Sequence, residues 1–509
     1  MYTESNANTG ADSGSKSIVS NDNNINNSSH KSVDKTSLNR QLSVNLDKME
    51  KVLKVKAKRF KKSLNDFKEK VRIEAMEMEI NRCDDNKRLK QVLGGWALGP
   101  KHMHHLATKP YEYNASAGSY LELLFLQKFW IWLAQYIPIW MSPCVITATG
   151  LLINIITSIA VLCYAPDARN EVPTWCFLIC AVGVFLYQTL DALDGKQCYK
   201  VQCTQIEEVY DHGCDAVSTI FVTMAAACAV QLGRTPELLF LLFLSTMIAF
   251  FSTHWLCHVT HQMVFGRVDV SEGQWVMIIV HLCTAYWGQR IWHTTLFWDT
   301  GPQLSQLLAI LTIISMSVTV VRNISMILGK KTPLDEMNVQ LVRRTDNIWA
   351  PVVPIAILTI FAVMSYSIGY FHVSPLLFIF TFGFAYAKVT IKLVMMNCCN
   401  GDMDYWDSSL TAPLLLATNT RFLALLHPKT ALLCAFVYSL MDLSRYFTYC
   451  SWDLRLALDL NIFSIKYPVG HPKNRRQCLG YYVNGFNNDI VLNNSNNSNK
   501  TDSNSKLVV

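Results

Sequence analysis

Apolar runs separated by polar connections occupy most of this chain. Each run is about twenty residues long, which is enough for a helix to cross the hydrocarbon core of a bilayer. Because a helix satisfies its own backbone hydrogen bonds in lipid, the pattern predicts an all-α, polytopic integral membrane protein with about ten transmembrane helices. The expected spans are 145–164, 174–193, 212–232, 238–256, 274–288, 304–328, 348–371, 375–395, 409–427 and 430–449.

Polar segments flank the apolar region, which we assign to a membrane domain at 111–465. Residues 1–40 are rich in Asn and Ser and are predicted to be disordered, as is the tail 466–509, which begins basic and becomes Asn-rich. The segment 41–110 is predicted to hold a basic amphipathic helix and a connector. Within it, apolar or small positions recur at helical spacing over 42–78, opposite many Lys and Arg residues. This helix would either lie on an anionic membrane surface or contact a partner as a helix or coiled coil.

Composition narrows the function class and charge sets the orientation. The chain is 51% hydrophobic and 16% charged, which is unlike a soluble protein, and it carries no nucleic-acid motif, so we expect the lipid bilayer as a partner and no nucleic acid. Lys and Arg are concentrated in the connections on the side of the basic N-terminus and in the C-terminal tail. Because cytosolic loops carry such an excess, both ends and the connection between spans two and three are predicted to face the cytosol.

Four aspartates bracket that connection. Asp191 and Asp194 close the second apolar run, and Asp211 and Asp215 open the third. Residues spaced by three or four share a helix face, and a polar loop at 195–210 would let the two helices run antiparallel with their acidic faces opposed. Carboxylates in a membrane are costly and mark functional sites, and hard oxygen ligands suit Mg²⁺ or Mn²⁺. The pattern therefore predicts a divalent cation site rather than ordinary capping aspartates.

Two neighbouring residues fit phosphoryl transfer at such a site. Gly195 would let the backbone approach a phosphate closely. His212 lies between two aspartates, and a neutral imidazole accepts a proton better than a carboxylate whose lone pairs hold a cation. The alternative for His212 is an ordinary surface histidine at the start of a helix. A cation transporter is a weaker alternative, because the aspartates lie at the ends of spans and not at their middles.

The motifs D-A-L-D-G-K-Q and D-H-G-C-D, which carry the four aspartates, together resemble the signature of the CDP-alcohol phosphotransferases. Within that family the chain is similar to the eukaryotic choline/ethanolaminephosphotransferases. The likeness extends over about 113–465 and includes W-M-S-P-C-V-I-T-A-T-G-L from Trp140 and F-G-R-V-D-V-S-E from Phe265. The second of these stretches looks more like the choline or dual-specificity branch than the ethanolamine-selective one.

The resemblance implies a reaction and its partners. CDP-choline or CDP-ethanolamine would donate its phosphoalcohol to diacylglycerol, giving phosphatidylcholine or phosphatidylethanolamine and CMP, with Mg²⁺ or Mn²⁺ as cofactor. The reaction would take place in the endoplasmic reticulum or Golgi membrane, with the active site facing the cytosol. The sequence fixes no oligomeric state, and a homodimer is compatible with it.

The resemblance also implies roles for particular residues. His212 would be the catalytic base of the eukaryotic branch, whereas elsewhere in the family the last aspartate, here Asp215, has that role. Substrate binding would fall to Gly195, Lys196 and Lys200. The implied metal ligands are Asp191, Asp194, Asp211 and Asp215.

The chain departs from the family pattern D-G-x-x-A-R and its surroundings at four positions. Cys198 and Tyr199 replace the Ala and Arg, Glu207 replaces a Gly, and Cys144 replaces an Asn that helps to hold the nucleotide in relatives. Tyr cannot supply the charge of Arg to a phosphate, although Lys200 can compensate in part as a point charge. Glu207 would add negative charge beside an acidic site.

Three explanations of these departures remain open. The segment has rearranged with activity retained, or the protein is a catalytically inactive membrane relative with a regulatory or scaffolding role. The third explanation is that residues 198–207 come from a wrongly spliced or wrongly predicted exon, since the match is good on both sides of them.

Overall fold

A computed structural model describes most of the chain beyond residue 96. The described residues are 97–109, 119, 121–264, 266, 270–295, 301–329, 347–419, 426–471, 473 and 474, together with Lys54, Lys56, Lys58, Lys61 and Lys62. The chain divides into two units, 1–82 and 83–509, which we describe separately. In the first unit, the five lysines are helical and exposed, and they belong to the predicted basic helix. The predicted disordered segment 1–40 and the residues after 474 lie outside the described residues.

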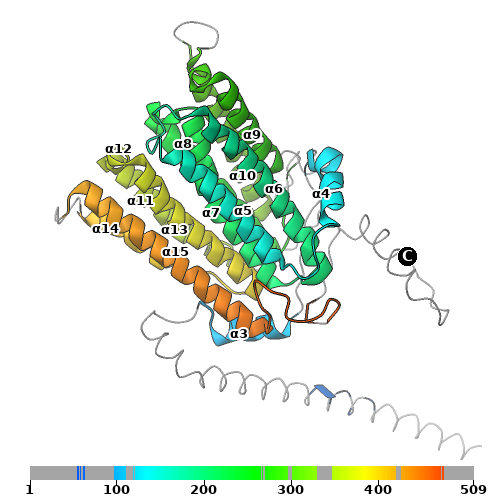
Figure 1. Cartoon of the computed structure of the whole chain (residues 1–509). Helices are drawn as coiled ribbons and strands as arrows, with labels where there is room; N and C mark the ends of the chain where they lie inside the picture. Colours follow the sequence, from blue (N-terminus) through cyan, green and yellow to red (C-terminus); the bar gives the residue numbers. More distant parts are fainter. Residues whose placement is uncertain are drawn as a thin grey trace, which may run out of the picture. The chain divides into compact units, whose positions relative to one another are not determined.

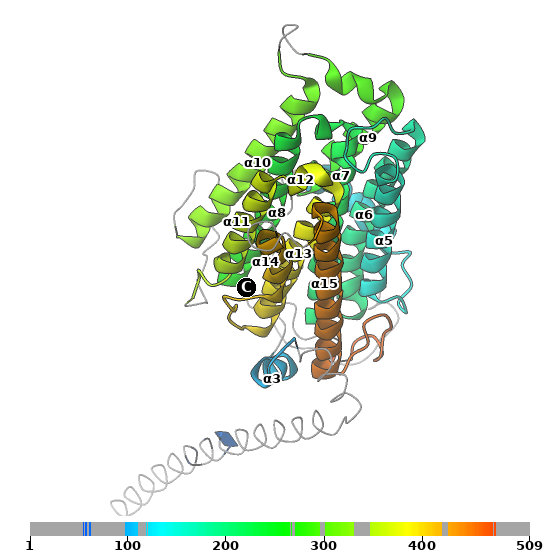
Figure 2. The same cartoon turned by 90° about the vertical axis from the view of Figure 1, so that its left-hand side faces the viewer.

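The second unit is a bundle of helices (Figure 1). Its longer helices are α5 Pro143–Leu162, α6 Thr174–Val201, α7 Gln205–Ala229, α8 Pro236–Thr260, α9 Val270–Trp287, α10 Leu304–Ile327, α11 Val352–Ile368, α13 Pro375–Cys399 and α15 Pro428–Leu458. Its shorter elements are α3 Pro100–Thr108, η1 Glu122–Leu126, α4 Gln127–Ala134, η2 Leu232–Arg234, η3 Gln289–His293, α12 Tyr370–Val373, η4 Ser408–Leu410 and α14 Thr411–Thr418. Figure 2 shows α3 at one end of the bundle, near the end of α15.

Every predicted span overlaps one of these helices. Within the described ranges, six helices are long and apolar enough to cross a bilayer, namely α5, α6, α7, α8, α10 and α13. The remaining four predicted spans fall on α9, α11, α14 and α15. On α10, apolar side chains such as Leu311 and Val321 are exposed, as expected of a helix that faces lipid. The prediction of an all-α polytopic membrane protein is confirmed.

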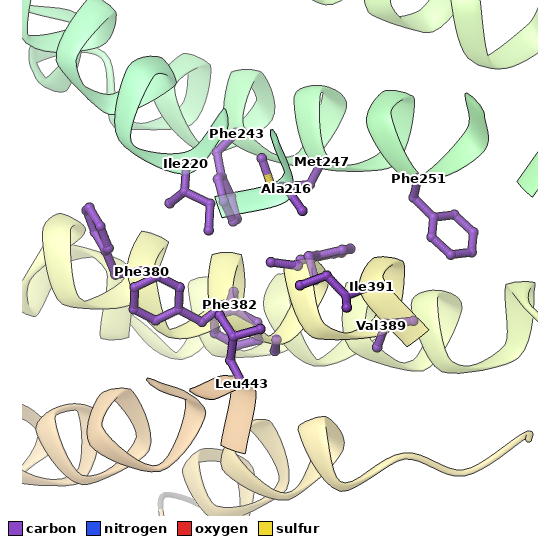
Figure 3. Packing of buried hydrophobic residues seen from close by; sticks show 14 of the residues in the cluster. Ala216, Ile220, Phe243, Met247, Phe251, Phe380, Phe382, Val389, Ile391 and Leu443 are labelled. Atoms are coloured by element: carbon purple, nitrogen blue, oxygen red, sulfur yellow. The ribbon is translucent and has the colours of Figure 1, made fainter. Parts of the chain in front are cut away.

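The apolar core lies where α7, α8, α13 and α15 meet. Figure 3 shows Ile220 of α7 and Phe243 and Met247 of α8 turned toward Phe382 of α13. Helices approach closely here because a glycine stands at the contact: a Cβ on Gly383 would lie 2.9 Å from the side chain of Ile220. Substitution of this glycine would therefore push α7 and α13 apart.

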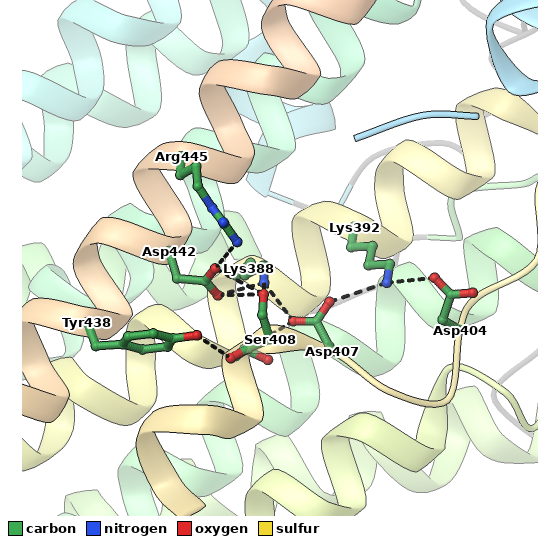
Figure 4. Close-up of polar contacts among 9 residues, drawn as sticks. Lys388, Lys392, Asp404, Asp407, Ser408, Tyr438, Asp442 and Arg445 are labelled. Carbon is green, nitrogen blue, oxygen red and sulfur yellow. Dashed lines mark hydrogen bonds and ion pairs between the residues drawn. The ribbon is translucent and has the colours of Figure 1, made fainter. Parts of the chain in front are cut away.

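A buried network of charges joins α13 to η4 and α15 (Figure 4). The ammonium group of Lys388 lies 2.8 Å from Oδ1 of Asp407 and 2.6 Å from Oδ2 of Asp442, and all three side chains are almost completely buried. Arg445 also contacts Asp442, at 2.9 Å. Lys392 bridges Asp407, at 3.3 Å, to an exposed aspartate at position 404. Buried charges require such pairing, since an unpaired one is strongly destabilising.

The connection between α6 and α7 differs from the polar loop predicted for 195–210. The helix α6 continues to Val201 and α7 begins at Gln205, so residues 202–204 alone join them. These three residues are called the connector below. The predicted loop was wrong because polarity was taken for a loop, although 195–201 contains no proline to stop α6 and Thr204 starts α7 as its N-cap. The aspartates therefore lie within the two helices and not at their ends.

Candidate functional site

Three carboxylates converge where α6 faces α7. Asp191 of α6 and Asp211 and Asp215 of α7 each offer an oxygen, and these oxygens lie within 4.8 Å of one another. Oδ1 of Asp191 and Oδ1 of Asp211 are buried and accept no hydrogen bond. Buried polar atoms are normally satisfied, and an all-carboxylate donor set fits Mg²⁺ or Mn²⁺. The residues present therefore fit a divalent cation.

Asp194, the fourth predicted ligand, lies one turn beyond Asp191 on α6 and is not part of this group of three. Its Oδ2 accepts a hydrogen bond from the hydroxyl of Thr147 on α5. Because α5 packs against both α6 and α7, it can hold the two acidic faces relative to each other. A second contact of this kind runs from Asn154 of α5 to Ser218 of α7, at 2.8 Å. A role of Asp194 as a metal ligand stays a prediction.

Tyr187 is a site residue that the sequence did not reveal. It lies one helical turn before Asp191 on α6 and donates a hydrogen bond to Oδ1 of Asp215 on α7. The ring packs against α5, since a Cβ on Gly150 would lie only 3.2 Å from it. Tyrosine in an apolar run reads as an ordinary core residue, and no local spacing indicates a partner 28 residues away.

His212 is buried and not a surface histidine, with 7% of its surface exposed. Its Nε2 lies 3.7 Å from Oδ2 of Asp211, which places the imidazole beside the carboxylate group. The ring packs on that of His254 of α8, with centroids 4.7 Å apart, and Nδ1 has no hydrogen-bond partner. An imidazole so placed can accept a proton next to the carboxylates, and the role of His212 as the base stays a prediction.

The three predicted substrate-binding residues have different surroundings. Gly195 faces open space, because no atom lies within 4 Å of where its Cβ would stand. The ammonium group of Lys196 lies 5.4 Å from the ring centroid of Trp130 and donates to its own helix at Ala192. Lys200 instead donates to the backbone carbonyl of Ala134 at the end of α4, so it would have to leave this contact to reach a substrate.

Glu207, one of the departures from the family pattern, caps the start of α7 beside the connector. Glu207 accepts hydrogen bonds from the backbone and the hydroxyl of Thr204, at 2.8 and 2.6 Å, and from the amide of Gln202, at 2.7 Å. This is a capping box for α7, in which the carboxylate satisfies the first backbone group of the helix. The negative charge of Glu207 is thus used within the connector. Cys144, at the start of α5, is completely buried.

No protein-family model matches the chain. Among known proteins, cholinephosphotransferase 1 of Homo sapiens is 34% identical over 365 residues, which cover 69% of this chain and 86% of the relative. Cholinephosphotransferase 1 of Danio rerio is 34% identical over 373 residues, or 71% of this chain and 94% of the relative. An uncharacterized CDP-alcohol phosphatidyltransferase class-I family protein of Dictyostelium discoideum is 30% identical over 305 residues, or 57% and 74%. The chain therefore belongs to the CDP-alcohol phosphatidyltransferase family, which confirms the family predicted from its aspartate motifs.

Proposed function

We propose that this protein transfers the phosphoalcohol of CDP-choline or CDP-ethanolamine to diacylglycerol. Family membership makes the chain a CDP-alcohol phosphotransferase, and the proposal adds the donor and the acceptor. The observation that carries it is the convergence of Asp191, Asp211 and Asp215 from two apolar helices. The names of the relatives, which are cholinephosphotransferases, favour CDP-choline as the first donor to test.

The cofactor in this proposal is Mg²⁺ or Mn²⁺, held by Asp191, Asp211 and Asp215, with Asp194 as a further ligand. When bound, a divalent cation neutralises phosphate oxygens and so stabilises the charge that develops in phosphoryl transfer. Two buried carboxylate oxygens without a hydrogen-bond partner support this assignment. Gly195 leaves open space beside the acidic face, which supports close approach of a phosphate.

The reaction forms one bond and breaks one at phosphorus, and it transfers one proton. The hydroxyl oxygen of diacylglycerol attacks the phosphorus atom that carries the alcohol, the bond from that phosphorus to the oxygen of CMP breaks, and CMP leaves. The hydroxyl proton passes to His212, whose position beside Asp211 supports its role as the base. Asp215 is less suited to that role, because Tyr187 donates a hydrogen bond to one of its oxygens. Lys196 and Lys200 remain candidates for binding the nucleotide.

A location follows from the same proposal. The protein is a multi-pass membrane protein, and we place it in the endoplasmic reticulum or Golgi membrane with the carboxylates toward the cytosol. The excess of Lys and Arg on that side of the membrane supports this orientation. A homodimer is compatible with the proposal, which requires no second copy.

Activity is favoured over an inactive relative by the structure of the connector. Residues 202–204 and Glu207 form a capped turn in which Glu207 accepts hydrogen bonds from Thr204 and Gln202, and this supports rearrangement of the segment with the acidic faces kept together. The missing Arg at position 199 is the feature that favours the inactive alternative.

The test is an assay of the full chain purified into lipid nanodiscs. Labelled CDP-choline or CDP-ethanolamine is supplied with diacylglycerol, with and without Mg²⁺ or Mn²⁺, and labelled phospholipid and CMP are measured. We expect metal-dependent product from the wild type, none from Asp211→Asn, and wild-type rates from Asp402→Asn, which changes an exposed aspartate outside the site. If the wild type makes no product but Tyr199→Arg does, the inactive relative is the correct assignment.

A further inference from the structure

We propose that the segment after α15 positions the carboxylates by holding the connector between α6 and α7. This C-terminal brace consists of residues 459–471, 473 and 474. The inference rests on the proposed function, because it treats Asp191, Asp211 and Asp215 as metal ligands. Part of the brace lies beyond residue 465, where the sequence predicts a disordered tail, and the structure instead describes residues in contact with the connector.

The brace bonds directly to two of the three residues of the connector. The backbone N–H of Cys203 donates to the carbonyl of Asn474, at 2.9 Å. The side-chain amide of Gln202 donates to the carbonyl of Asn461, at 3.4 Å. Gln202 and Asn474 are completely buried, so these bonds are protected from water.

The brace also contacts the starts of two helices that carry site residues. The hydroxyl of Ser142, the N-cap residue of α5, donates to the carbonyl of Ile462 at 2.5 Å. The ring of Phe463 packs edge-on against that of Tyr210, with centroids 5.8 Å apart. Tyr210 directly precedes Asp211, and α5 carries Thr147, the partner of Asp194. The brace therefore contacts α7 next to Asp211, and it reaches Asp194 of α6 indirectly, through α5 and Thr147.

Contacts within the brace fix its own shape. Asp459 ends α15 in the left-handed conformation, with φ of 56°, and its carboxylate accepts hydrogen bonds from Lys466, Tyr467 and Lys473. The side-chain amide of Asn474 donates to the carbonyls of Tyr467 and Pro468, at 2.9 and 3.1 Å. Asp459 therefore turns the chain back, and Asn474 closes the loop onto the connector.

This arrangement bears on the metal site because the connector is so short. Three residues leave little slack between α6 and α7, so displacement of the connector moves Asp191 relative to Asp211. Ligand sets work only when held within a fraction of an ångström of the required geometry. The brace residues touch neither substrate nor cation in this proposal, and they act through the connector as positioning residues.

Two substitutions remove contacts within the brace with little change in the shape of the side chains. Asp459→Asn keeps a residue that tolerates the left-handed conformation and removes the charge that holds Lys466 and Lys473. Asn474→Asp is isosteric and loses both side-chain donors. The matched control is Ser464→Ala, since Ser464 is exposed and its hydroxyl accepts a hydrogen bond from the side chain of Asn461. A chain stopped after Leu458 lacks the whole brace and is a third test variant, and a chain stopped after Gln477, which retains the brace, is its control.

The experiment measures hydrogen–deuterium exchange of peptides covering 202–206 and the dissociation constant for Mn²⁺ by electron paramagnetic resonance, on the full-length variants and the two shortened chains in nanodiscs. We expect Asp459→Asn, Asn474→Asp and the chain stopped after Leu458 to speed exchange at the connector and to weaken Mn²⁺ binding by about tenfold. This is the smaller end of the effects seen when residues that orient metal ligands are mutated. The half-saturating Mg²⁺ concentration of the transfer reaction should rise in parallel. Ser464→Ala and the chain stopped after Gln477 should match the wild type.

The failures of the two proposals are distinguishable. If the wild type binds no Mn²⁺, the metal site itself is wrong, whatever the brace does. If the wild type binds Mn²⁺ but the folded brace variants bind it equally well, the positioning role is wrong. Unchanged exchange at the connector in the chain stopped after Leu458 would also overturn the brace.

Discussion

The phenol of Tyr187 on α6 donates a hydrogen bond to the carboxylate of Asp215 on α7. This bond ties the two acidic helices together on the side of the site away from the connector. It leaves the second oxygen of Asp215 available to a cation and restricts rotation of the carboxylate. Outer contacts of this kind orient metal ligands in many proteins. The hydrogen bond between Tyr187 and Asp215 thus holds α6 against α7 within the bundle, as we propose that the brace does at the connector.

The first prediction concerns this pair. Tyr187→Phe removes the hydroxyl and keeps the ring that packs on α5, so the fold should persist while Asp215 loses its orienting partner. We expect the Mn²⁺ dissociation constant to rise by about tenfold. Titration of Mn²⁺ into the purified variant measures this. Tyr164→Phe, which changes an exposed tyrosine just after the end of α5, is the control, and equal affinities in both variants would contradict an orienting role for Tyr187.

The second prediction separates proton transfer from metal binding. His212→Gln removes the proposed base, so kcat should fall by about 10²–10⁴-fold, the usual contribution of a general base. The affinity for Mn²⁺ should stay close to that of the wild type, because His212 does not belong to the group of residues whose ligand atoms converge. Asp211→Asn should instead weaken Mn²⁺ binding directly, so that its loss of activity follows from the loss of the metal.

Measurements of kcat and of the Mn²⁺ dissociation constant on both variants test this separation. His372→Gln, which changes an exposed histidine on α12, controls for loss of any imidazole. Loss of Mn²⁺ binding in His212→Gln would show that the histidine serves the metal site and not the proton.

The sequence predicted the fold and the core of the site because both depend on local patterns. Apolar length indicates helices in a membrane, and spacing by four residues put Asp211 and Asp215 on one face of α7. Family motifs added the prediction that His212 is the base, which the proposed experiments test. These are properties of single segments, so they can be recognised in the sequence alone.

Contacts between distant segments left no such signal. Tyr187 and Thr147 resemble any polar residue in an apolar helix, and the bond from Cys203 to Asn474 joins positions 271 residues apart through a backbone group that any residue carries. The length of α6 was missed for a related reason. A helix that runs past the apolar zone becomes polar, and polar residues between two spans are easily taken for a loop.

The third prediction concerns the capping box at the connector. Replacing Glu207 by the Gly of the family pattern should not restore a family-like site, because it removes the acceptor for Thr204 and Gln202. We expect Glu207→Gly to destabilise the protein by about 1–2 kcal/mol, as loss of a cap does. Glu207→Gln keeps an N3 residue able to accept these bonds and should lose less. Thermal unfolding in detergent compares the two variants, and a Glu207→Gly protein as stable as the wild type would contradict the structural role of Glu207.

The last prediction concerns the buried charges of α13. Burial alone would raise the pKa of Asp407, but Lys388 and Lys392 outweigh it and lower the pKa to about 2. The pKa of Asp407 is therefore below the unfolded value of about 4, so its stabilising contribution is present at neutral pH and is lost as pH falls from about 4 toward 2.

Replacing Lys388, which pairs with both Asp407 and Asp442, tests the contribution of these ion pairs to stability at neutral pH. Lys388→Met leaves the buried Asp407 and Asp442 with only Lys392 and Arg445 as charged partners among the described residues, and we expect it to destabilise the protein by about 3–5 kcal/mol. The double variant Lys388→Met, Asp442→Leu also removes one of the two buried carboxylates and should recover part of this loss. Thermal unfolding of Lys388→Met, Asp442→Leu and the double variant forms a double-mutant cycle. Additive effects would mean that the Lys388–Asp442 pair is not coupled, whereas the 2.6 Å contact between these side chains predicts strong coupling.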